Sequence, residues 1–211
     1  MKGLIFDLDG TLLDSMPAWN QLLDNMLLKN GITPPPDLLD RTKTLGLENA
    51  TGMVLEEFGL NADPAAVYQM FQDEMEYQYC NVIPLKAGVQ EFLDAMKGRI
   101  PMAVATATSR ALVEKALAHH NLNDYFQSIT TVAEVGIGKH DPKVFLTAAE
   151  KLEVSADECV IFEDSLTAIR SANAAGFYTV AIYEATNQHE QDNLMMEANL
   201  YVKDFHEIKK V

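Results

Sequence analysis

The sequence is poor in basic residues relative to acidic ones. It has 16 Lys and Arg residues against 31 Asp and Glu residues, which gives a formal net charge of −15. A chain this acidic repels nucleic acids and anionic membranes at long range, so we expect neither as a partner. The same field opposes anionic substrates. A phosphate site in this chain would therefore need local positive charge, from a metal ion or from placed Lys and Arg residues.

Cysteine is also scarce, and long hydrophobic runs are missing. The two cysteines, Cys80 and Cys159, occur in a chain whose start turns acidic within seven residues, unlike a signal peptide. In that setting we expect both thiols to be reduced rather than joined in a disulfide. No apolar run approaches the roughly 18–20 residues that span a bilayer. These absences predict a cytoplasmic protein, which we expect to be a monomer by default.

What the sequence does contain is an alternation of short apolar runs and helical periodicity. Its 211 residues, 48% of them hydrophobic, are enough for one sizeable core and a small satellite domain. Runs typical of buried parallel strands occur at residues 3–6, 102–105, 159–162 and 178–182, with shorter ones near 128–132 and 200–202. Apolar residues at helical spacing lie between them, as at Phe145, Leu146, Ala149 and Leu152. This alternation predicts an α/β fold with a doubly wound, Rossmann-like parallel sheet.

One segment interrupts the alternation. Between residues 16 and 81 we find no convincing strand but three amphipathic stripes, of which the third includes Met70, Phe71 and Met75. We expect these three side chains to be buried. The pattern predicts an all-helical cap domain at residues 15–83, inserted into a catalytic α/β core formed by residues 1–14 and 84–211.

Polar residues gather directly after the predicted strands. In chain order they are Asp7, Asp9, Thr106, Lys139, Glu163 and Asp164. In open α/β sheets, ligands bind outside the carboxyl ends of the strands, so these groups are expected to converge on one edge of the sheet. That convergence, from four separate places in the chain, is a stronger signal than any one motif.

Metal-assisted phosphoryl transfer requires these residue types. Placing Asp7 and Asp9 side by side is costly unless a cation holds them together, and Mg²⁺ prefers oxygen ligands. A Lys adds positive charge near a phosphate, while a Thr hydroxyl and backbone N–H groups can hold its oxygens. One carboxylate can attack phosphorus, and a second can protonate the leaving oxygen and later activate water. The set therefore indicates a Mg²⁺-dependent phosphomonoesterase that uses an aspartyl phosphate.

The same motifs resemble those of the haloacid dehalogenase superfamily. Asp7-x-Asp9-Gly10-Thr11 is the most specific of them, and Thr106, Lys139 and the pair Glu163-Asp164 follow in order and at ordinary spacing. The resemblance covers nearly the whole chain. It is with subfamily I, whose members similar to beta-phosphoglucomutase and phosphoglycolate phosphatase carry a helical cap after the first strand.

The resemblance implies a role for each of these groups. Asp7 would be the nucleophile and a metal ligand, and Asp9 the general acid/base, ligating the metal through its backbone carbonyl. Thr106 and Lys139 would hold the transferring phosphoryl group. Asp164 would complete the Mg²⁺ site, with Glu163 as a supporting acid that can act through a bound water. The inserted helices would form a lid over a small phosphorylated metabolite.

Residues beside these motifs are candidates for substrate contact. They are Leu8, Ala107, Thr108 and Arg110 in the core. Arg110 could equally cover the following helix instead of meeting substrate. In the cap, Trp19, Arg41, Lys43 and the stretch 44–49 are expected near the substrate, although Trp19 also suits a place in the cap core.

Three other functions compete with phosphomonoester hydrolysis. A sugar phosphomutase similar to beta-phosphoglucomutase is disfavoured by Thr11, because phosphatases of this family usually have Thr after the Gly of the first motif. It is also disfavoured by Trp19, which stands where the hexose mutase has a His in its cap. The stretch 45–49 also lacks the Arg of that mutase. A non-catalytic phosphate-binding regulatory protein predicts a damaged site, yet every expected group is present. A dehalogenase would need neither metal nor Asp9.

Overall fold

The computed structural model describes residues 1–42 and 47–208 of the chain. Lys43 and residues 44–46, which the sequence placed near the substrate, lie outside the described residues. The chain divides into two compact units: Met1–Ser15 together with the chain from Ile83 onward, and Met16–Val82.

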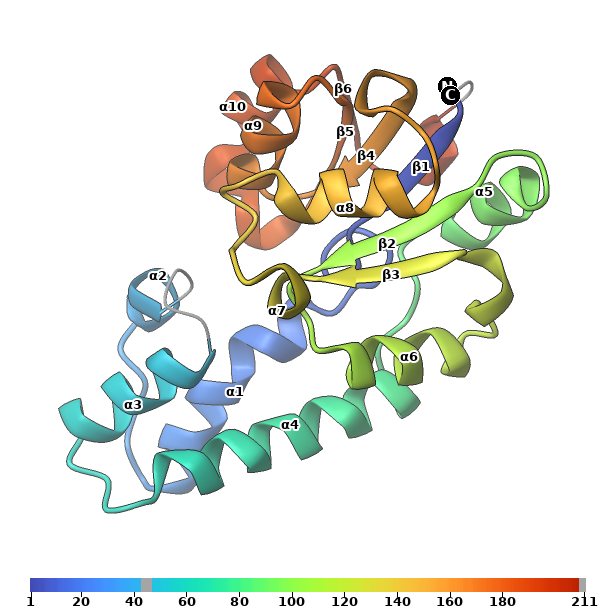
Figure 1. Ribbon diagram of the computed structural model, residues 1–211. Coiled ribbons are helices and arrows are strands. Elements are labelled where there is room, and N and C mark those ends of the chain that lie inside the picture. Colours follow the sequence, from blue (N-terminus) through green and yellow to red (C-terminus); the bar gives the residue numbers. More distant parts are fainter. Residues whose placement is uncertain (43–46, 209–211) are drawn as a thin grey trace. The chain divides into compact units, whose positions relative to one another are not determined.

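The first unit is built on one parallel sheet (Figure 1). Its strands are β1 (Gly3–Phe6), β2 (Met102–Thr106), β3 (Ser128–Thr131), β4 (Cys159–Glu163), β5 (Tyr178–Ile182) and β6 (Leu200–Val202). Their order is β3-β2-β1-β4-β5-β6, so β2 and β3 lie on one side of β1 while β4, β5 and β6 lie on the other. This confirms the predicted doubly wound α/β fold, and sheets of this kind bind ligands at the carboxyl ends of the strands, where the strand order reverses.

Helices cover both faces of this sheet. They are α5 (Val89–Met96), α6 (Arg110–His119), α7 (Val132–Val135), α8 (Lys143–Lys151), α9 (Leu166–Ala174) and α10 (Gln191–Glu197). Short 3₁₀ turns are η1 (Asn123–Tyr125), η2 (Ala156–Glu158), η3 (Ala185–Glu190) and η4 (Phe205–Glu207). Ile5, Ala105 and Ile161 pack on the face covered by α8 and α9.

Phenylalanines fill the opposite face. Phe6 of β1 stacks on Phe162 of β4 with ring centroids 4.6 Å apart. Phe92 of α5 and Phe205 of η4 close over this pair, with their ring centroids 5.5–6.4 Å from those of Phe6 and Phe162. These rings anchor the two central strands whose ends carry the polar motifs.

The second unit is helical, as the sequence predicts. It contains α1 (Met16–Lys29), α2 (Leu38–Thr42), α3 (Leu47–Glu57) and α4 (Pro64–Asn81). Asp63 caps α4, because its side chain accepts a hydrogen bond from the Ala65 N–H at 3.1 Å and Pro64 opens the helix. Inside this unit, the indole N–H of Trp19 donates to the Tyr79 hydroxyl at 3.0 Å.

Two apolar residues that the stripes placed in the core are exposed instead. Met70 of α4 and Leu146 of α8 each keep 43% of their surface. The buried positions of α4 are Phe71, Met75 and Tyr79, four residues apart, so Met70 lies about 100° around the helix from that line. Leu146 lies at the same angle from Phe145 on α8. The stripes were therefore narrower than the sequence suggested.

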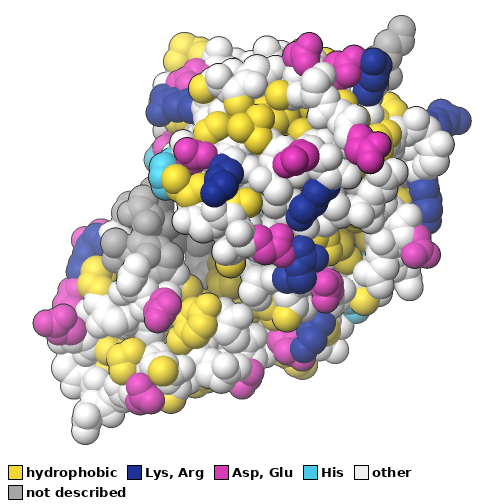
Figure 2. Space-filling view, in the orientation of Figure 1, with side chains coloured by type: hydrophobic (Ala, Val, Ile, Leu, Met, Phe, Trp, Pro, Cys, Tyr) yellow, Lys and Arg dark blue, Asp and Glu magenta, His cyan; other side chains and the backbone are white. Residues whose placement is uncertain are grey.

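Charged side chains are interspersed on the surface. On the face shown in Figure 2, acidic and basic groups alternate rather than forming one large patch of either sign. Exposed ion pairs include Arg170 with Glu197, at 2.6 Å. Among the described residues, no helix is both long enough and apolar enough to cross a membrane.

Candidate active site

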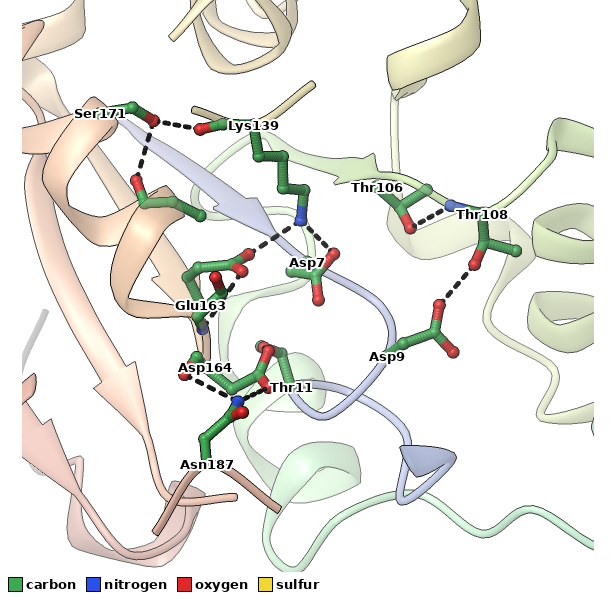
Figure 3. A network of polar contacts seen from close by, with 12 residues as sticks. Asp7, Asp9, Thr11, Thr106, Thr108, Lys139, Glu163, Asp164, Ser171 and Asn187 are labelled. Atoms are coloured by element: carbon green, nitrogen blue, oxygen red, sulfur yellow. Dashed lines mark hydrogen bonds and ion pairs between the residues drawn. The ribbon is translucent and has the colours of Figure 1, made fainter. Parts of the chain in front are cut away.

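The end of β1 delivers Asp7 into a buried position. Its backbone N–H donates to the Phe162 carbonyl at 2.9 Å, which continues the pairing of β1 with β4 past the last strand residue. The Asp7 side chain keeps 7% of its surface. The chain then turns sharply at Gly10, whose φ of +80° favours glycine. Figure 3 shows the Asp7 carboxylate beside the Lys139 ammonium at the carboxyl end of β1.

Lys139 lies between the carboxylates of Asp7 and Glu163. Its ammonium donates to Asp7 Oδ1 and to Glu163 Oε2, the latter at 2.9 Å. The loop that carries Lys139 follows α7, which Thr131 opens with a capping box. Ser171 on α9 then donates to the Lys139 carbonyl at 2.6 Å. Lys139 is thus fixed at its backbone and at its charged end.

Three buried carboxyls meet beside Lys139. One oxygen from each of Asp7, Glu163 and Asp164 lies within 4.8 Å of the others. Burial and the charge of Glu163 raise the pKa of Asp7 to about 8, against the opposing effect of Lys139. Burial and the charge of Asp7 likewise raise the pKa of Asp164 to about 8, and burial raises the pKa of Glu163 to about 7. Three such acids could hold a hard divalent cation, which prefers oxygen ligands.

The positive partner of this cluster stays charged. Burial alone lowers the pKa of Lys139, but the negative charges of Asp7 and Glu163 outweigh it and raise that pKa above its ordinary value. The ammonium therefore offers a permanent positive charge to an incoming anion.

Two hydroxyl groups bind the carboxylate of Asp9, the second acid after β1. Ser15 Oγ donates to Asp9 Oδ1 and Thr108 Oγ1 donates to Asp9 Oδ2, both at 2.6 Å. Thr106, at the end of β2, accepts a hydrogen bond from the Thr108 N–H at 3.1 Å, which orients its own hydroxyl. Figure 3 shows the Asp9 carboxylate turned toward Thr108 and away from the cluster around Lys139.

Comparison with known proteins identifies the family. A model of haloacid dehalogenase-like hydrolases matches residues 4–182. The chain belongs to this family. The hydrolase is 31% identical over 185 residues to fructose-1-phosphate phosphatase from Escherichia coli, covering 85% of this chain and 95% of that protein. It is 26% identical over 199 residues to a phosphorylated carbohydrates phosphatase from Thermotoga maritima, covering 94% and 91%.

Comparison with a solved structure supports the fold. A family IA haloacid dehalogenase hydrolase from Entamoeba histolytica superposes with a TM-score of 0.84 at 24% identity, covering 99% of this chain and 96% of that chain. Family membership and these relatives make the protein a hydrolase of the phosphatase type.

The structure brings most of the predicted groups of the hydrolase together. Asp7, Lys139, Glu163 and Asp164 lie together in one cluster. The flanking candidates lie in different settings: the Leu8 side chain is fully buried, and Ala107 is exposed.

Arg110 is engaged away from the acid cluster. Its Nε donates to Glu134 Oε1 at 2.6 Å, and its terminal nitrogen donates to the Ile129 carbonyl at 2.8 Å. In the cap, Arg41 pairs with Glu57. Contact of these flanking residues with substrate stays a prediction.

Three residues near the site were not foreseen. Lys86 donates to the Gly10 carbonyl at 2.8 Å, and Glu184 accepts from Lys86 at 2.8 Å. Asn187 donates to Asp164 Oδ2, also at 2.8 Å. Lys86 and Asn187 do not directly follow a predicted strand, whereas Glu184 stands two residues past the strand at 178–182 and could have been found by that signal. Asn187 directly precedes the polar stretch 188–192, which the sequence suggests is solvated surface, so only the fold reveals the position of Asn187.

Proposed function

We propose that this hydrolase is a Mg²⁺-dependent phosphomonoesterase that acts on a small phosphorylated metabolite through an aspartyl phosphate on Asp7. The observation that carries the proposal is the cluster of Asp7, Glu163 and Asp164 with the Lys139 ammonium between two of them. Three buried acids are costly without a cation, and a phosphate needs positive charge in so acidic a chain.

The oxygen donors of this acid cluster fit magnesium. We propose that Asp7 and Asp164 hold the ion through their carboxylates, Asp9 through its backbone carbonyl, and Glu163 as a supporting acid. When bound, the ion would offset the charge of the phosphate oxygens and lower their repulsion toward the Asp7 carboxylate.

The residues of the chain would divide the chemistry between them. An Asp7 carboxylate oxygen attacks phosphorus, and the ester oxygen leaves with a proton from Asp9. Asp9 then takes a proton from a water that attacks the aspartyl phosphate, which releases phosphate and restores Asp7. Throughout, the Lys139 ammonium and the Thr106 hydroxyl hold the phosphoryl oxygens.

Sugar phosphates are the substrates that the relatives favour. The two curated relatives are named for fructose 1-phosphate and for phosphorylated carbohydrates. We propose a substrate of this class, with the chemistry in the α/β core of residues 1–14 and 84–211 and substrate selection in the helical cap of residues 15–83.

A panel of phosphorylated metabolites, incubated with Mg²⁺ and followed by phosphate release, tests this function. We expect Asp7→Asn to lower kcat by at least about 1,000-fold, because it removes the attacking oxygen's charge. Asp9→Asn should also cripple turnover. Full turnover by Asp7→Asn would refute the mechanism. Glucose 1-phosphate separates hydrolysis from the mutase reaction, since formation of glucose 6-phosphate without phosphate would favour a mutase.

A further inference from the structure

Lys86 lies behind the turn that follows Asp9, and the proposed reaction does not use it. Its ammonium donates to the Gly10 carbonyl at 2.8 Å, to the Tyr183 carbonyl at 2.7 Å and to Glu184 Oε2 at 2.8 Å. An ammonium has three protons, and all three are used here. The Lys86 side chain is 13% exposed and that of Glu184 is 3% exposed. The buried Lys86–Glu184 ion pair is therefore a fixed structural support, called the strut below, and does not contact substrate.

Glu184 connects this strut to the 3₁₀ turn η3. Its Oε1 accepts hydrogen bonds from the backbone N–H and the hydroxyl of Thr186, both at 3.2 Å. Its carbonyl accepts from the Asn187 N–H at 3.0 Å. One carboxylate thus fixes both the ammonium of Lys86 and the turn that carries Asn187.

Asn187 returns from that turn to the acid cluster. Its side-chain amide donates to Asp164 Oδ2 at 2.8 Å and to the Asp164 carbonyl at 3.3 Å. Figure 3 shows it approaching Asp164 from the side away from Lys139. Gly10 abuts the same carboxylate, because a Cβ on Gly10 would lie 2.5 Å from Asp164 Oδ2. The contacts close a ring from Gly10 through Lys86, Glu184 and Asn187 to Asp164.

We propose that Asn187, held in place by Glu184 and Lys86, is a positioning residue that fixes the Asp164 carboxylate in the orientation that binds the metal ion. This rests on the proposed function. A neutral amide suits the task, since it occupies one lone pair of Oδ2 without competing as a cation. Groups that orient metal ligands in this way typically contribute 10–100-fold to metal affinity.

Calorimetric titration of the purified full chain with MgCl₂ tests the proposal. Asn187→Leu keeps the size of the side chain and removes its donor, so we expect the Mg²⁺ dissociation constant to rise about tenfold. At saturating Mg²⁺, kcat should stay within about threefold of the wild type, because the reacting groups are intact. Gln188→Leu is the matched control: Gln188 is the neighbour on the same turn, and its replacement should leave both values unchanged.

A second variant tests the support for Asn187 without touching it. Lys86→Met combined with Glu184→Gln removes both charges of the strut, so no buried ion is left unpaired. We expect it to weaken Mg²⁺ binding in the same direction as Asn187→Leu. If Asn187→Leu fails to fold, this double variant still tests the proposal, and Asn187→Ala provides a smaller substitution at position 187.

The outcomes separate this inference from the proposed function. A wild type that binds Mg²⁺ while Asn187→Leu binds it equally well would overturn the positioning role and leave the phosphatase standing. Variants that only lower the melting temperature in EDTA, with Mg²⁺ affinity unchanged, would overturn the positioning role in the same way. A wild type that neither binds Mg²⁺ nor releases phosphate would refute the proposed function, and the inference with it.

Discussion

Gly10 combines a left-handed backbone with close contact to a proposed metal ligand. Its φ is +80°, and an added Cβ would lie 2.5 Å from Asp164 Oδ2. We predict that Gly10→Ala loses about 1–2 kcal/mol of unfolding free energy from backbone strain alone and loses Mg²⁺ affinity as Asp164 is displaced. Urea denaturation and calorimetric Mg²⁺ titration measure the two effects.

Gly98 provides the matched control for this substitution. It has a φ of +74°, but nothing lies within 4 Å of its would-be Cβ. Gly98→Ala should lose a similar amount of unfolding free energy, about 1–2 kcal/mol, and keep full Mg²⁺ affinity and activity. Equal loss of Mg²⁺ affinity in both variants would show that contact with Asp164 is not what requires glycine at position 10.

At the scale of elements, the terminal turn η4 completes the aromatic layer beneath the site. Phe205 is 2% exposed, and its ring centroid lies 5.7 Å from that of Phe162. We predict that Phe205→Ala costs about 3–5 kcal/mol of unfolding free energy, because it empties a fully packed position under β1 and β4.

Chemical denaturation measures this cost. Met196→Ala is the control, since Met196 on α10 is 73% exposed and its loss should change the free energy of unfolding by less than about 0.5 kcal/mol. A cost below about 1 kcal/mol for Phe205→Ala would mean that η4 is peripheral to the core.

Strand periodicity was enough to predict the sheet and the convergence of several candidate residues at one edge of it. Because parallel strands end at one edge, the residues after them had to converge, and the structure places Asp7, Glu163 and Lys139 together. Lys86 and Asn187 could not be foreseen, since Lys86 lies in an irregular segment and Asn187 in the short 3₁₀ turn η3, and the paths of both depend on tertiary packing. The edges of the buried helix faces could not be predicted from apolar spacing alone, since Met70 is apolar yet exposed.

At the scale of the whole molecule, the acid cluster links stability to pH. The pKa values of Asp7 and Asp164 are raised to about 8 and that of Glu163 to about 7, against about 4 for unfolded carboxyls. Between these values the folded state binds more protons than the unfolded state, so the free energy of unfolding falls as pH rises. Without metal, we predict a melting temperature that falls from about pH 5 to about pH 8.

Magnesium should reverse this trend, because it binds the deprotonated carboxylates. We predict that the rise in melting temperature caused by Mg²⁺, relative to EDTA, is larger at about pH 8 than at about pH 5.5. Thermal scanning in both conditions measures it. Asp164→Asn removes one titrating ligand and should shrink the difference. A Mg²⁺ effect that is the same at every pH would contradict the link between the cluster and the ion.

The proposed mechanism depends on transfer of the phosphoryl group to Asp7. Acid quenching during steady turnover of a sugar phosphate, followed by borohydride reduction and mass spectrometry of the proteolytic peptides, detects an acyl phosphate as homoserine. The mechanism predicts homoserine at position 7 only when substrate and Mg²⁺ are both present. Phosphate release with Asp7 unmodified, or with homoserine found at position 9 or 164 instead, would contradict the mechanism.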